Sequence, residues 1–159
     1  VQELARTHTA EMRAFLRGIR PVEVGEAGLA SSLRQVVADF RKHTGLAASF
    51  ESHGTPPDGS EPHWAELVQI VREALTNVQK HARASRVVVS LRCDRNQVEI
   101  SIADDGAGFP FSGKYTLEEL ELLRRGPFSI ERRVRSLGGK LLVESRPGRG
   151  STLTVQLGT

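Results

Sequence analysis

The chain is poor in cysteine and in aromatic residues. Its 159 residues include one cysteine, one tryptophan and one tyrosine. Because Cys93 is alone, the chain can form neither an internal disulfide nor a Cys-x-x-Cys metal or redox site. Such cysteine usage fits a reducing compartment, so we expect a cytoplasmic location, whether or not a membrane also anchors the full-length protein.

Long hydrophobic runs and a strong charge imbalance are also missing. No apolar run approaches the roughly 18–20 residues of a membrane-spanning helix, and no signal-like segment opens the chain, so we expect no membrane segment here. Lys and Arg number 22 against 19 Asp and Glu, which gives a net charge of +3. This small excess comes without aromatic stacking positions or a recognition-helix pattern, and it predicts no binding of nucleic acid.

What the chain does have is regular hydrophobic periodicity. The spacing predicts helices over 2–20, from 29 to near Gly45, and over 63–84 and 127–137, and strands over 46–51, 86–92, 97–103, 140–145 and 151–157. Segment 104–125 bears glycines at its start and is then polar and helix-prone, and it is predicted to be a lid-like loop. The order indicates an α+β fold: a two-layer α/β sandwich with helices covering a mixed sheet of about five strands, preceded by an N-terminal helix.

Four polar residues share one face of the predicted helix 63–84. Glu73 and Asn77 are four residues apart, and Lys80 and His81 follow three and four positions later. All four therefore project along one stripe. A carboxylate, a carboxamide and basic groups suit Mg²⁺ and the phosphates that accompany it. Taken alone, a solvated helix face is the commoner explanation of such a stripe.

Three glycine-bearing segments are candidates for ligand contacts. At 104–108, D-D-G-A-G follows a predicted strand; its glycines allow close approach, and the Asp104 carboxylate can accept a hydrogen bond from an exocyclic amine. At 126–133, the amides of a helix start can hold phosphate oxygens. At 147–152, glycines turn between two strands. Taken singly, an ordinary turn, helix junction or hairpin explains each segment as well.

Together and in this order, these segments resemble a known family. The run R-E-A-L-T-N-V-Q-K-H-A at 72–82 resembles an N box, D-D-G-A-G resembles a D-x-G-x-G box, and G-P-F-S-I at 126–130 with L-G-G at 137–139 is similar to the region after an ATP lid. The chain thus resembles the catalytic ATP-binding domain of bacterial two-component sensor histidine kinases, of the Bergerat-fold superfamily that includes gyrase, Hsp90 and MutL. The subfamily it resembles pairs with helix-turn-helix response regulators.

The resemblance implies roles for the matching residues of the N box. Asn77 would ligate Mg²⁺, and Glu73 would help to position the metal or polarise the transfer, so both are candidate catalytic residues. Lys80 and His81 would face the phosphates of ATP.

The remaining motifs would complete the ATP site. Asp104 would bind the adenine amino group, Gly106 and Gly108 would shape the pocket, and Ser151 would lie behind Asp104, where the family usually has Thr. A mobile lid is expected over 109–125. The candidates that follow this lid are Gly126, Ser129, which stands where glycine is frequent, and Ile130.

The resemblance also implies a domain division and partners. Residues 1–21 would be the C-terminal part of a dimerisation helix, and 22–159 the catalytic domain. The family's phosphoacceptor histidine lies in a context like E-L-H-D, which no segment here matches. We therefore expect the acceptor in a dimerisation helix absent from this chain, little autophosphorylation by the chain alone, onward transfer to a response-regulator aspartate, and a homodimeric full-length protein.

Two other functions stay open. An anti-sigma-factor serine kinase shares the N box and the D-x-G-x-G box, although it normally lacks a helix like the one predicted at 2–20. A non-catalytic nucleotide-sensing or dimerisation module would bind ATP only as a ligand. The stimulus, the cognate regulator and the order of the lid without nucleotide do not follow from the sequence.

Overall fold

The computed structural model describes residues 28–57 and 61–159. The helix expected at 2–20, and with it the domain division at residue 21, lies outside the described residues. Within the described part, no helix has the length and apolar character needed to cross a membrane.

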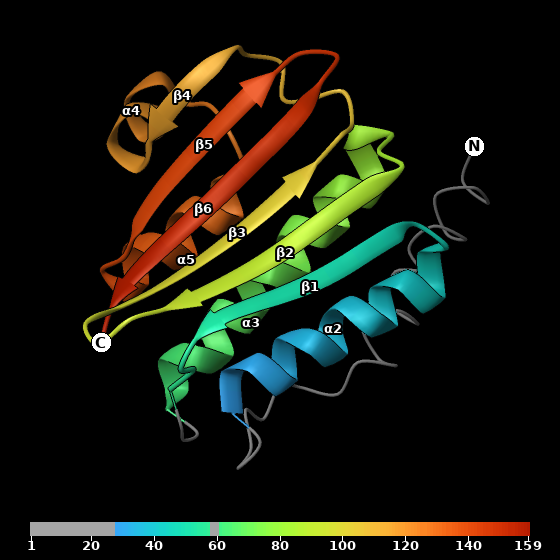
Figure 1. Ribbon diagram of the computed structural model, residues 1–159. Coiled ribbons are helices and arrows are strands. Elements are labelled where there is room, and N and C mark those ends of the chain that lie inside the picture. Colours follow the sequence, from blue (N-terminus) through green and yellow to red (C-terminus); the bar gives the residue numbers. More distant parts are fainter. Residues whose placement is uncertain (1–27, 58–60) are drawn as a thin grey trace, which may run out of the picture.

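A six-stranded mixed sheet forms one layer (Figure 1). The strand order is β1-β2-β3-β6-β5-β4; β1 pairs with β2 in parallel, and all other neighbours are antiparallel. The strands are β1 (Ala47–Gly54), β2 (Arg86–Cys93), β3 (Gln97–Asp104), β4 (Gly113–Thr116), β5 (Lys140–Arg146) and β6 (Gly150–Gly158). The mixed sheet is confirmed, and it has one strand more than the sequence predicted.

Helices cover one face of this sheet. Figure 1 shows α3 (Pro62–Asn77) and α5 (Phe128–Leu137) behind the strands and α2 (Gly28–Thr44) alongside β1; α2 also contacts α3. The alternation of β3 explains the two faces: Val98, Ile100 and Ile102 are buried toward the helices, whereas the residues between them are only half-buried. The two-layer α/β sandwich is therefore confirmed, with its core between the sheet and the helices.

Segment 104–125 differs from the expected continuous loop. Residues 113–116 form β4, which pairs with the edge strand β5, and Leu117–Leu123 form α4. A capping box begins this helix. The Thr116 hydroxyl accepts from the Glu119 amide, and the Glu119 carboxylate accepts from the Thr116 amide. Leu117 and Leu120 are buried. The prediction of a loop is wrong for 113–116, because a four-residue strand is specified by its distant partner rather than by its own pattern. Helix α4 lies in the part of the segment that was expected to be helix-prone.

Two element ends also differ from the predicted ones. Strand β1 continues to Gly54, three residues beyond the predicted end, because its pairing with β2 continues to Cys93. The long helix of the N box is not α-helical throughout: α3 ends at Asn77, and a π-helical turn, η1 (Val78–Ala82), completes it. This turn directs the last side chains of the polar stripe.

Candidate functional site

A cavity of about 840 Å³ lies between α3, η1, the ends of β3 and β6, and the start of α5. Much of its lining is apolar and includes Ala74, Val78, Ile102, Phe109 and Leu153. Polar side chains stand at its two ends. Of the candidates named from the sequence, the cavity brings together Glu73, Asn77, His81, Asp104, Gly108, Gly126, Ser129, Ile130 and Ser151.

Asp104 is fixed at the end of β3 by two hydrogen bonds. Its Oδ1 accepts from the amide of Gly106 at 2.8 Å, and its Oδ2 accepts from the Ser151 hydroxyl at 2.8 Å. Ser151 lies directly opposite Asp104 in the β3–β6 ladder, which places its hydroxyl behind the carboxylate. Each carboxylate oxygen keeps further capacity to accept a hydrogen bond from a ligand.

The glycine loop after β3 packs tightly on the end of η1. A Cβ built at Gly106 would lie 2.2 Å from the carbonyl oxygen of Ala82, so only glycine fits there. The Ala107 amide donates to that same carbonyl at 2.5 Å. Gly106 does not line the cavity itself; it sets the close approach of the loop. Gly108, with φ of +78°, does line the cavity.

Ser145 is a supporting residue that the sequence reasoning missed. Its buried hydroxyl accepts a hydrogen bond from the Phe109 amide at 2.8 Å, and the Ala107 carbonyl accepts another from the Gly148 amide at 2.8 Å. The loop is thereby tied to β5 and to the β5–β6 turn. The signal was available, because Ser145 follows the buried Leu141 and Val143 in strict alternation and must point inward.

The polar stripe of α3 reaches the cavity with one exception. Glu73, Asn77 and His81 line it, whereas Lys80 is exposed and does not. The prediction of one polar face assumes an α-helix, in which residues three and four apart share a face. A π-turn rotates less per residue, so in η1 the fourth residue after Asn77 stays on the face and the third does not.

Glu73 is held by groups from α5. The Ser129 hydroxyl lies 3.2 Å from each of its carboxylate oxygens, and Nε of Arg133 lies 3.1 Å from Oε1. Arg133 in turn donates to Glu66 on α3 at 2.6 Å. Arg133 was not identified from the sequence, since nothing in one sequence shows which arginine of R-R-V-R faces α3. Arg132, from the same run, lines the cavity.

The segment after α4 closes the other end of the cavity. Gly126, with φ of +93°, precedes α5, and Ile130 is buried beneath it. Beside Gly126 lies the buried carboxyl of Glu131, whose Oε2 has no partner among the described residues. Burial, and to a smaller extent the charge of Glu121, raises the pKa of Glu131.

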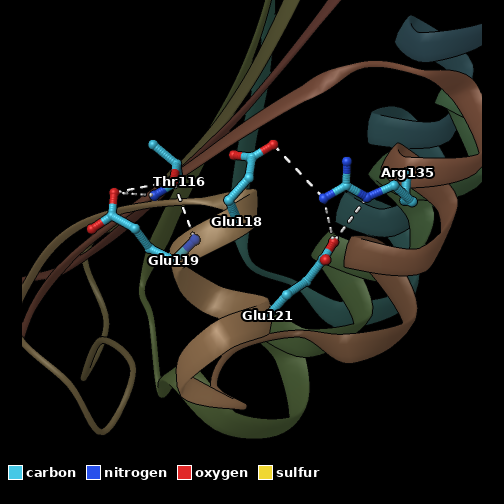
Figure 2. A network of polar contacts seen from close by, with 5 residues as sticks. All are labelled: Thr116, Glu118, Glu119, Glu121 and Arg135. Atoms are coloured by element: carbon cyan, nitrogen blue, oxygen red, sulfur yellow. Dashed lines mark hydrogen bonds and ion pairs between the residues drawn. The ribbon is translucent and has the colours of Figure 1, made fainter.

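Helix α4 is attached to α5 by ion pairs as well as by its buried leucines. Figure 2 shows Arg135 of α5 between Glu118 and Glu121 of α4, with Nη2 at 3.7 Å from the first and 2.9 Å from the second. The capping box of Thr116 and Glu119 lies at the start of the same helix. These exposed ion pairs link α4 to the helix that carries Ser129 and Arg133.

Residues 64–159 match the model of the histidine kinase-, DNA gyrase B-, and HSP90-like ATPase family. The chain belongs to this family. The match covers α3, η1 and every element of the site described above, and it implies that the domain binds ATP.

Curated relatives in the family are similar over nearly the whole chain. The histidine-protein kinase/phosphatase DegS of Brevibacillus brevis is 28% identical over 99% of this chain, and the sensor histidine kinase LiaS of Bacillus subtilis (strain 168) is 31% identical over 99%. The chain spans about two fifths of the length of these relatives, 39% and 41%. It is therefore homologous to one part of a sensor kinase.

Solved structures of the family have the same fold. The ATP-binding domain of PrrB from Mycobacterium tuberculosis superposes with a TM-score of 0.60 at 26% identity, covering 82% of this chain and 93% of that one. The superposition supports the sandwich described here as the ATP-binding unit of the family.

Proposed function

We propose that this chain is the catalytic ATP-binding domain of a sensor histidine kinase. The observation that carries the proposal is that Asp104 and Asn77 line one largely apolar cavity, within a chain similar to sensor kinases along nearly its full length. An apolar cavity with a few fixed polar groups is the usual form of a nucleotide site.

Asp104 would bind the adenine amino group. Its carboxylate is held by Gly106 and Ser151 and faces a cavity whose walls, including Ile102 and Leu153, can pack on the planar base. Gly108 would let the backbone approach the nucleotide closely. Fixed hydrogen bonds behind the carboxylate orient it before the ligand arrives, which lowers the cost of binding.

Asn77 fits a Mg²⁺ ion that accompanies the phosphates. No hydrogen bond occupies its side chain within 28–57 and 61–159, it lines the cavity, and its amide oxygen is the hard ligand that Mg²⁺ takes alongside phosphate oxygens. When bound, the ion would neutralise charge that develops on the transferred phosphoryl group. Glu73 and His81 would lie beside the same phosphates, and Lys80 would reach them from the rim.

The mobile lid expected over 109–125, with the segment that follows it, would close over the phosphates. Gly126 and Ser129 line the cavity just after this lid, where α5 begins and its first amides can bind phosphate oxygens. Phosphoryl transfer depends on positioning and charge neutralisation, so closure would exclude water and orient the γ-phosphate.

The acceptor would be a histidine outside this chain. Residues 1–21 would end a dimerisation helix joined to the catalytic domain at 22–159, the full-length protein would be a homodimer, and the phosphoryl group would pass to an aspartate of a response regulator with a helix-turn-helix output domain. We place this domain in the cytoplasm, where ATP and the regulator are present.

The test supplies the acceptor in trans. The chain is incubated with γ-labelled Mg-ATP and a dimerisation segment that carries an E-L-H-D-type histidine, and acid-labile phosphohistidine is measured. We expect label on the segment, its loss with Asn77→Asp, and its retention with Asn96→Asp, a matched change in the exposed turn between β2 and β3. ATP binding without phosphohistidine would refute the kinase and favour a nucleotide-sensing module.

A further inference from the structure

A single arginine joins two glutamates at the wall of the cavity. The Arg133 guanidinium lies between Glu66 and Glu73, at 2.6 Å from an oxygen of the first and 3.1 Å from an oxygen of the second. Its hydrogen bond to Glu66 is the main reason that the pKa of Arg133 is raised. The side chains of all three are a third exposed or less. Two carboxylates therefore hold one cation in a fixed place between α3 and α5.

Only one of these carboxylates faces the cavity. Glu73 lines it. Glu66, which lies about two helical turns closer to the start of α3, does not. Both oxygens of Glu73 also lie 3.2 Å from the Ser129 hydroxyl. The carboxylate is thus turned toward α5, where its position and charge are both set by α5 side chains.

Glu73 stands at the end of the cavity away from the glycine loop. That loop packs on Ala82, and Glu73 comes nine residues earlier in the continuous α3–η1 helix. The separation along the helix axis is roughly 13 Å, from nine residues at about 1.5 Å each. A nucleotide with its base at Asp104 would extend its phosphates toward this carboxylate. Unscreened, a negative charge there would repel a polyphosphate, and more strongly in a partly desolvated cavity than in water.

We propose that Arg133 is a positioning residue that holds Glu73 against α5 and offsets part of its negative charge, so that a nucleotide polyphosphate can occupy the cavity beside it. The inference rests on the proposed nucleotide site. It explains why a carboxylate can line a site for a polyanion. Removing the arginine leaves the Glu73 carboxylate in place without its counter-charge. The free-energy cost of truncating one partner of such a pair comes largely from the charge that is left unpaired.

The test compares ligands with and without phosphates. Adenosine, ADP and ATP are titrated calorimetrically into the chain, into Arg133→Met, and into the double variant Glu73→Gln/Arg133→Met. Arg135→Met is the matched control, since Arg135 is on the same helix and is also paired with two glutamates, but outside the cavity. Arg133→Lys, which keeps the charge, serves if the methionine variant does not fold.

Specific outcomes decide the inference. We expect Arg133→Met to weaken ATP binding about tenfold and adenosine binding less than about twofold, and the double variant to recover most of the ATP affinity. The ATP affinity of Arg133→Lys should lie between those of Arg133→Met and the unchanged chain. Arg135→Met should bind ATP as the unchanged chain does. Equal losses for adenosine and ATP, or no recovery in the double variant, would show a merely structural role. A chain that binds no adenine nucleotide would overturn the proposed site and this inference together.

Discussion

The two loops that close the cavity are built differently. The loop after β3 is held mainly through its backbone: the Ala107 amide and carbonyl bond to Ala82 and Gly148, and the Phe109 amide bonds to Ser145. The segment 124–129 is bonded mainly to the helices on either side of it. The amides of Arg124 and Arg125 donate to carbonyls of α4, the Pro127 carbonyl accepts from the Glu131 amide of α5, and the Ser129 hydroxyl contacts Glu73 of α3. Phe128 within it is 57% exposed. The glycine-loop end of the cavity is therefore tied to η1, to β5 and to the β5–β6 turn, whereas the other end is linked to α3 through the Ser129 side chain.

We expect the largest loss of stability when the packing beneath segment 124–129 is removed. Leu120 of α4 is fully buried and lies beneath Gly126. Leu120→Ala should lower the free energy of unfolding by about 3 kcal/mol, because it leaves a cavity under the loop. Leu122→Ala is the control, since Leu122 is 84% exposed and should cost little. Denaturant unfolding measures both; equal midpoints for the two variants would show that α4 is not packed as described.

A smaller loss of stability is expected from a substitution in the glycine loop after β3. Gly106→Ala should cost about 2 kcal/mol of stability, because the new Cβ meets the backbone of Ala82 and the loop must move. Gly138→Ala, at φ of +67° with no atom within 4 Å of its Cβ, isolates the cost of backbone strain. That control should cost about 1 kcal/mol. A smaller loss of stability in Gly106→Ala than in Gly138→Ala would contradict the close packing of the loop on Ala82.

A smaller effect depends on pH. Because the folded state raises the pKa of Glu131, this carboxyl stabilises the fold when protonated, and the contribution is lost as the pH rises through the folded-state pKa. Glu131→Gln should therefore raise stability by about 1 kcal/mol at neutral pH. The gain should vanish below about pH 4, where both forms are neutral. Thermal unfolding across pH measures it, and a gain that persists in acid would contradict the burial of the charge.

The smallest effect concerns the ion pairs of Figure 2. Arg135 is 53% exposed, so water and salt screen its contacts with Glu118 and Glu121. Arg135→Gln should change the free energy of unfolding by less than about 0.5 kcal/mol. A larger, salt-sensitive loss would mean that charge, rather than the buried leucines, holds α4 in place.

Much of the fold follows from local pattern, and the exceptions are non-local. The alternation of Val98, Ile100 and Ile102 predicts β3 and its inward face from the sequence alone. Strand β4 is missed because its four residues carry no such pattern and are specified by β5, some thirty residues later. The sixth strand therefore appears only when the sheet is assembled, whereas α4 lies in the part of 104–125 that the sequence already indicates as helix-prone.

The site shows the same division. Asp104, Asn77 and Ser151 stand in motifs whose order identifies the family, and the structure places all three around one cavity. The structure places Lys80 outside it because a π-turn replaces the assumed α-turn. Arg133 was missed for a related reason: its importance comes from a contact between two helices, which spacing within one helix does not reveal.

A calorimetric titration of the chain with ATP, with and without Mg²⁺, beside Asp104→Asn and Asp94→Asn, decides whether the cavity is a nucleotide site. We predict saturable binding that Mg²⁺ strengthens, and a loss of about tenfold or more in affinity in Asp104→Asn, because an amide cannot accept from Gly106, Ser151 and a ligand together. Asp94→Asn, in the turn between β2 and β3, should bind normally. No binding by the unchanged chain, or equal affinity in a folded Asp104→Asn variant, would contradict this prediction.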